Sequence, residues 1–128
     1  LLLTLASGQS VLLTGDIEKE TEKQILKGHP GLRVNVLLIP HHGSKTSSST
    51  AFIKQLNPDI AIFSYGYRNR FHFPAPAILK RYQSRKIKLF NTTNGALDIT
   101  SNISNNSLSI KQFRYTHRRF WHREPEAL

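Results

Sequence analysis

The feature that most constrains the fold is a pair of short apolar runs without alternating polar residues. Residues 36–39 read VLLI and residues 60–63 read IAIF. A strand exposed on one face alternates with a period of two, whereas a strand covered on both faces is apolar throughout. Because the segments between these runs have helical patterns, the sequence predicts an α/β fold with buried strands and flanking helices.

The rest of the chain predicts further strands and helices joined by turns. Residues 7–10 (SGQS) separate two β-forming runs as in a hairpin, Gly28 is a natural helix stop, and Pro76 suits the first turn of a helix. The 45–50 segment (KTSSST) supplies N-cap candidates for the helix that follows. The predicted strands cover residues 1–6, 11–15, 32–40, 60–66, 86–92, 95–100 and 107–115, and the predicted helices cover 17–28, 51–56 and 77–84.

Composition narrows the chemistry and the context. The chain has no Cys, so any metal must be held by His and carboxylate groups, which suits Zn or Mn. It has no Met, so we expect a piece of a longer protein with further residues upstream of Leu1. No apolar run approaches the roughly 18 residues that a membrane-spanning helix needs, and the start lacks the basic flank of a signal peptide. We therefore expect this piece itself to be soluble.

The chain is strongly basic, with a formal net charge of +10 from 18 Lys and Arg against 8 Asp and Glu. No acidic residue lies between Asp59 and Asp98. Two interpretations stay open: a solvated basic face, or a surface that binds a polyanion by displacing counterions from phosphates. The basic residues of this acid-free segment are Arg68, Arg70, Lys80, Arg81, Arg85, Lys86 and Lys88.

Asp16 follows a predicted strand directly, and Gly15 before it leaves room for close backbone approach. A carboxylate at a strand end can bind one metal ion or bridge two, as a two-metal hydrolytic site requires. The alternative is that Asp16 caps the helix expected from Ile17.

His41 and His42 emerge from the end of the apolar strand and favour the metal interpretation. Neutral His is a common Zn ligand, and Asp16 lies 25 residues upstream at the end of a strand expected to be adjacent. If the backbone is extended here, the two side chains point in opposite directions, so that one binds metal while the other supports it or acts as acid or base. A hydrogen-bonded structural pair is the alternative.

Hydroxyl groups follow the His pair at Ser44 and at residues 47–49. We do not expect a Ser nucleophile, because the glycine-flanked turn of the G-x-S-x-G kind is absent. A helix cap or a phosphate contact explains these hydroxyl groups more simply.

These motifs in this order resemble the C-terminal half of a metallo-β-lactamase-fold domain. More narrowly, they resemble the domain at the end of the ComEC family of competence proteins, which pass transforming DNA through the inner membrane. The resemblance runs from residue 1 to about residue 99. It rests on LLTGD (12–16), LLIPHHGSKTSSS (37–49), PDIAIFSYG (58–66), NRFHFPAP (69–76) and NTTNGA (91–96).

The resemblance implies a four-layer αββα sandwich, with residues 1–110 as its C-terminal half and residues 111–128 as a basic, aromatic tail. Asp16 matches the bridging aspartate, and one of His41 and His42 matches the late histidine ligand, so that these residues form the metal and catalytic site. The family's early His-x-His-x-Asp-His cluster must then lie upstream of Leu1. Two divalent ions, Zn or Mn, are implied, with no nucleotide cofactor, and the chain alone should be inactive.

The activity implied is a metal-dependent nuclease acting on the DNA strand that is not imported. Its partners would be single-stranded DNA and the rest of the parent inner-membrane protein with its channel, and the domain would face the periplasm or the exterior. The implied nucleic-acid contacts are Ser44, Asn69, Arg70 and His72. One departure affects His72: many relatives have His directly before the first Pro of this loop, where this chain has Phe73.

Aromatic and basic residues mix at two places. Phe71 and Phe73 suit either stacking on unpaired bases or ordinary core packing. The tail suits single-stranded nucleic acid, a membrane surface, or a last strand that covers the sheet. Its residues are Lys111, Phe113, Arg114, Tyr115, Arg118, Arg119, Phe120, Trp121 and Arg123.

Two alternatives to the nuclease stay open. Since one fold carries many chemistries, the chain fits a metallo-β-lactamase-fold hydrolase of another substrate. It also fits a basic nucleic-acid-binding module whose metal site is vestigial.

Overall fold

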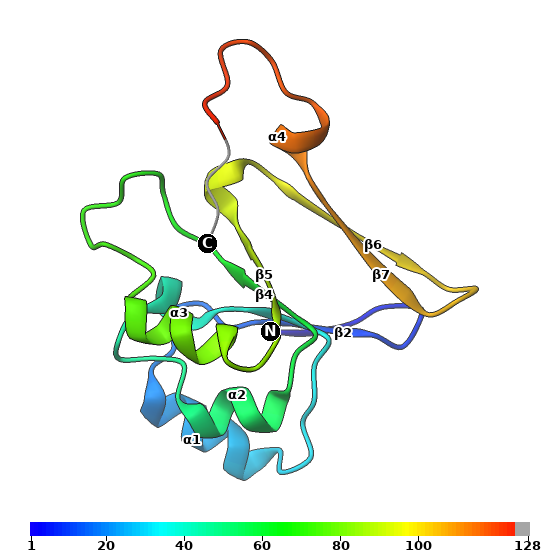
Figure 1. Ribbon diagram of the computed structural model, residues 1–128. Helices are drawn as coiled ribbons and strands as arrows, with labels where there is room; N and C mark the ends of the chain where they lie inside the picture. The colour runs from blue at the N-terminus through cyan, green and yellow to red at the C-terminus, as the bar shows by residue number, and fades with distance from the viewer. Residues whose placement is uncertain (125–128) are drawn as a thin grey trace.

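A five-stranded mixed sheet organises the computed structural model, which describes residues 1–124 (Figure 1). The first two strands form the predicted hairpin, and the next three run parallel to the second. The order of the strands across the sheet is the same as their order along the chain. The strands are β1 (Leu2–Thr4), β2 (Ser10–Leu13), β3 (Val36–Leu38), β4 (Ile60–Phe63) and β5 (Lys88–Asn91).

Three helices cover one face of this sheet, and a two-stranded antiparallel sheet lies on the other side (Figure 1). The helices are α1 (Lys19–Gly28), α2 (Thr50–Leu56) and α3 (Pro76–Gln83), and the second sheet pairs β6 (Leu97–Asn102) with β7 (Ser107–Gln112). The arrangement confirms the predicted α/β class and the mixed sheet with flanking helices.

Local signals placed three helix ends well. Helix α1 ends at Gly28, α3 begins at Pro76, and the Ser49 hydroxyl caps α2 by accepting from the Phe52 amide. Several predicted bounds were wrong: the strands predicted over 32–40 and 60–66 are confined to Val36–Leu38 and Ile60–Phe63. Helix α1 begins at Lys19 rather than at residue 17, and the last strand stops at Gln112, where the chain turns into the short helix α4 (Phe113–Thr116).

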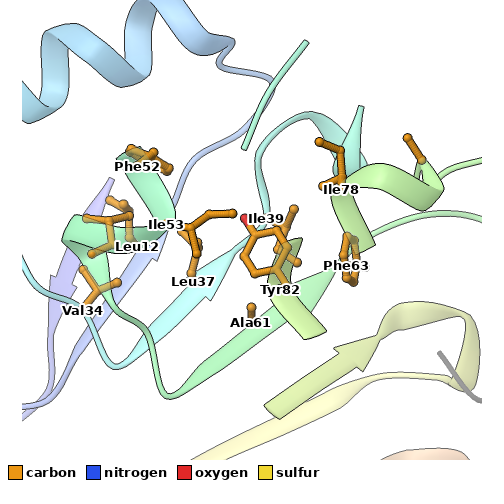
Figure 2. Close-up of a cluster of buried hydrophobic side chains, with 12 residues drawn as sticks. Leu12, Val34, Leu37, Ile39, Phe52, Ile53, Ala61, Phe63, Ile78 and Tyr82 are labelled. Carbon is orange, nitrogen blue, oxygen red and sulfur yellow. The ribbon is translucent and has the colours of Figure 1, made fainter. Parts of the chain in front are cut away.

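The central strands are buried on both faces, as their apolar runs predicted. Leu37 and Ala61 face the helices and pack with Phe52, Ile53 and other side chains of the main core (Figure 2). Val36 belongs instead to a second cluster, which β6 and β7 cover. Alternate residues of one strand therefore fill two separate cores, which explains why no polar residue interrupts the run.

Residues 125–128, the end of the predicted tail, lie outside the described residues. Among the helices of residues 1–124, none is long and apolar enough to cross a membrane.

Tyr82 allows a pH test of this packing. Its buried hydroxyl donates to Ser48 Oγ at 3.1 Å, and burial raises the pKa of Tyr82 well above its usual value. Above about pH 10 the unfolded chain therefore releases a proton that the folded chain retains, so the free energy of unfolding falls as pH rises.

We expect Tyr82→Phe to lose about 1 kcal/mol at pH 7, because the buried hydrogen bond is removed. At pH 11 only the wild type carries an ionisation penalty, of roughly 1.4 kcal/mol, so the deficit of Tyr82→Phe should vanish or reverse sign. Urea denaturation at both pH values measures this, with exposed Tyr115→Phe as the control. A deficit that stays constant between pH 7 and pH 11 contradicts the prediction.

Candidate active site

The candidate site is built from loops that leave the carboxyl ends of β2, β3 and β4. Because these strands are parallel and adjacent, the loops after Leu13, Leu38 and Phe63 meet at one edge of the sheet. Two hydrogen bonds join the first two loops: Thr14 Oγ1 donates to Leu38 O at 2.6 Å, and the His41 amide donates to Gly15 O at 3.0 Å.

The backbone of the His pair is left-handed, which corrects the expectation of an extended chain. His41 has φ 48° and ψ 43°, His42 has φ 56° and ψ 15°, and Gly43 continues with φ 83°. Such conformations cost a non-glycine residue on the order of 1–3 kcal/mol, and they are found where the surroundings fix the geometry of a site. Gly43 is required, because a Cβ there would lie 2.8 Å from Phe63 Cε1.

His42 points one ring nitrogen inward and the other toward Asp16. Its Nδ1 lies 2.5 Å from Ser64 O, and its Nε2 lies 3.3 Å from Asp16 Oδ1. A carbonyl oxygen only accepts, so Nδ1–H donates, and in the neutral ring Nε2 then carries a lone pair. That lone pair faces a carboxylate oxygen, and two acceptors at this distance need a proton or a cation between them.

A proton would make the contact a His42–Asp16 ion pair, and a divalent metal would make both groups its ligands. A histidine that ligates through Nε2 while Nδ1–H donates to a carbonyl is the usual supported arrangement, and a carboxylate oxygen completes a donor set suited to Zn or Mn. Asp16 does not cap α1, whose N-cap residue is Glu18. Among residues 1–124, no group of three or more His, Asp or Glu side chains is close enough to hold a metal ion.

His41 faces a different carboxylate, that of Glu18, which sequence reasoning missed. His41 Nδ1 lies 3.4 Å from Glu18 Oε1 and 3.3 Å from Thr46 Oγ1, while Thr46 donates to Glu18 at 2.8 Å. Since the Thr46 proton is used for Glu18, His41 Nδ1–H is the donor in this cluster. The two histidines thus have separate carboxylate partners, so they are not equivalent.

Glu22, one helical turn after Glu18, is also absent from the sequence-based site. It is fully buried, and its carboxylate accepts from the Ser48 amide at 2.5 Å and from the Ser49 amide at 2.8 Å. The spacing of four residues places both acids on one face of α1, toward the loop that follows the His pair. That spacing was the available signal, but a charged residue on a polar helix is normally exposed.

An open pocket of about 620 Å³ lies over these residues. Phe73 forms part of its wall, stacked against the His42 ring with centroids 6.1 Å apart and against Phe71 at 5.6 Å. Phe73 therefore supports the His pair, whereas Phe71 is exposed. The lining residues are Asp16, His41, His42, Ser44, Tyr65, Gly66, Asn69, Phe71 and Phe73.

The four residues predicted to contact nucleic acid are placed differently. Ser44 and Asn69 line the pocket, but Asn69 exchanges hydrogen bonds with the Phe73 backbone at 2.9 and 2.8 Å and so holds its own loop. Arg70 is exposed, with its guanidinium 4.8 Å from the centre of the Phe71 ring. His72 is exposed and does not line the pocket. Their roles stay predictions.

Three curated proteins are similar in sequence to this chain. The chain is 42% identical over 85 residues to ComE operon protein 3 of Bacillus subtilis (strain 168), a match that covers 66% of the chain and 11% of that protein. It is 32% identical over 126 residues to competence protein ComA of Neisseria gonorrhoeae, a match that covers 97% of the chain and 18% of that protein. It is 39% identical over 105 residues to recombination protein 2 of Haemophilus influenzae, a match that covers 82% of the chain and 13% of that protein.

These matches support a competence-related family. The chain spans less than a fifth of the length of each of these relatives. No family model matches it. The match to competence protein ComA covers 97% of the chain and therefore spans the motifs that carry the site.

Glu22→Ala tests whether the buried carboxylate holds the loop after the His pair. The substitution leaves the buried Ser48 amide and the half-buried Ser49 amide without their acceptor, so we expect a loss of about 3 kcal/mol in the free energy of unfolding. Urea denaturation measures the loss, and amide hydrogen exchange should show weaker protection at Ser48 and Ser49.

Glu20→Ala is the matched control on the same helix. Glu20 is exposed and pairs with Lys23 at 3.0 Å, so its removal should change stability by less than about 0.5 kcal/mol. Similar losses for the two variants would show that Glu22 does not anchor the loop.

Proposed function

We propose that this chain is the C-terminal part of a metallo-β-lactamase-like, metal-dependent hydrolase domain in a DNA-uptake membrane protein, acting as a nuclease on the non-imported strand. The observation that carries the proposal is the convergence of His42 Nε2 and Asp16 Oδ1 at 3.3 Å, with His42 Nδ1 held by Ser64 O. In this proposal the parent protein lies in the inner membrane, with this domain on the periplasmic or outer side.

The layer order supports the fold part of the proposal. Helices, a mixed sheet and a second small sheet follow one another, as expected for the latter part of an αββα sandwich. The second cluster of buried residues lies between the two sheets, where such a sandwich has its inner core.

In the proposed site, His42 is the ligand among the two histidines. Its ring is fixed by Ser64 O, and Asp16 offers a carboxylate oxygen beside the same position. His41, held by Glu18 and Thr46, supports the loop or moves a proton from the other side of the pocket. Bound divalent ions would supply an activated hydroxide and stabilise the charge that develops on the phosphodiester.

The substrate part of the proposal rests on the relatives and on the pocket rim. Competence protein ComA and recombination protein 2 carry names that fit DNA handling. Arg70 presents a planar cation beside the exposed Phe71 ring, a combination that suits a phosphate next to an unpaired base.

The test uses the full-length domain that contains this chain. We expect Asp16→Ala and His42→Ala to lose bound Zn or Mn, and to cleave single-stranded DNA more than about 100-fold more slowly, because a direct ligand should cost more than a supporting group. Metal content and cleavage rate are measured in parallel. His41→Ala should lose less metal than His42→Ala.

His29→Ala is the control, since His29 is exposed and lies at the end of α1 away from the pocket. Equal cleavage by the wild type and Asp16→Ala would contradict the catalytic assignment. Metal-independent DNA binding without any cleavage would favour the binding module instead, whereas metal-dependent hydrolysis of a different substrate would keep the fold and reject the nuclease.

A further inference from the structure

A second open pocket, of about 610 Å³, adjoins the candidate active site. Tyr65 and Gly66 line both pockets, so the two share a wall formed by the loop after β4. The two pockets are therefore neighbours on the surface, separated by Tyr65 and Gly66.

The far wall of the second pocket comes from the C-terminal segment. After α4 the chain folds back toward the turn that follows β5 (Figure 1). Two guanidinium groups fasten this return: Arg114 donates to Thr93 O at 3.1 Å, and Arg123 donates to the same oxygen at 2.5 Å. The segment that the sequence marks as a tail is thus part of a concave surface, at least as far as residue 124.

Aromatic rings and guanidinium groups alternate along this surface. Arg123 lies 3.7 Å from the centre of the Tyr67 ring, and Arg119 lies 5.3 Å from that of Trp121. The Trp121 side chain lines the pocket and is 61% exposed. None of the described residues that line this pocket is acidic.

We propose that the second pocket binds the continuation of a single nucleic-acid strand whose scissile phosphate lies at Asp16 and His42. A base stacks on Trp121, and the backbone phosphates contact Arg114 and Arg123. An exposed ring supplies a stacking surface for any base, and guanidinium groups bind phosphate oxygens through paired donors. This inference rests on the proposed function and adds a binding site for the strand outside the cleavage site.

The shape of the surface favours nucleic acid over a lipid bilayer. A membrane-binding segment presents its apolar side chains outward with the basic residues around them. Here the cations Arg114 and Arg123 line a pocket and are fixed to Thr93, and this pocket shares Tyr65 and Gly66 with the candidate site. Those positions suit a flexible anionic strand.

Trp121 is the sole tryptophan of the chain, so its fluorescence reports directly on this pocket. The experiment titrates the 128-residue chain with a twelve-residue oligothymidylate in EDTA, so that no cleavage occurs. We expect saturable quenching, and a labelled oligonucleotide should bind Trp121→Ala roughly 5- to 150-fold more weakly, the range for loss of one stacked base. Trp121→Phe should recover part of the affinity because it keeps a ring.

Arg114→Gln should weaken binding and lower the slope of log affinity against log salt by about 0.7, the value for one phosphate contact on a single strand. Arg85→Gln is the matched control, since Arg85 is an exposed arginine at the opposite edge of the sheet. Far-UV circular dichroism verifies that each variant is folded.

Three outcomes decide the inference. Equal affinity of the wild type, Trp121→Ala and Arg114→Gln would overturn it, and so would a Trp121 response to anionic lipid vesicles without a response to the oligonucleotide. Quenching by the oligonucleotide with the expected losses would support it. Because the assay contains no divalent metal, intact binding alongside absent cleavage in the full-length domain would reject the nuclease and leave this site standing.

Discussion

The contact on which the candidate site depends most is that of the buried Glu22 carboxylate with the Ser48 and Ser49 amides. It joins α1 to the segment between the His pair and α2. Glu18, the N-cap residue of α1, contacts Thr46 and His41 in the same segment. One helix thereby fixes both ends of the loop, and a bond to a charged acceptor in the interior is stronger than one in water.

Parallel strands supply the other constraint. The register that pairs Leu13 with Leu38, and Leu38 with Ile62, brings three loops to one edge at similar heights. The ends of adjacent parallel strands are the usual place for ligand sites in such sheets. Asp16, His42 and the Ser64 carbonyl come from three different loops, so their meeting depends on the sheet rather than on any local motif.

The parts of the site that sequence could predict are those with a local signal. Uninterrupted apolar runs predicted the buried strands. The end of α1 was predicted by Gly28, the start of α2 by the serines before it, and the start of α3 by Pro76. The left-handed backbone of His41 and His42 had no such signal, because non-glycine residues rarely adopt it. The burial of Glu22 depends on a loop more than twenty residues away, and no pattern within α1 reveals it.

The positions of the basic side chains in the fold could not be predicted from their positions in the sequence either. The acid-free segment between Asp59 and Asp98 suggests one basic face, but the fold divides it between two edges of the sheet. Arg68 and Arg70 lie in the loop after β4, beside the candidate site, whereas Arg85, Lys86 and Lys88 line a separate hollow of about 520 Å³ at the start of β5. Net charge therefore indicates affinity for polyanions in general. Only the position of each cation relative to Asp16 and His42 indicates which of them can hold a substrate in place for reaction.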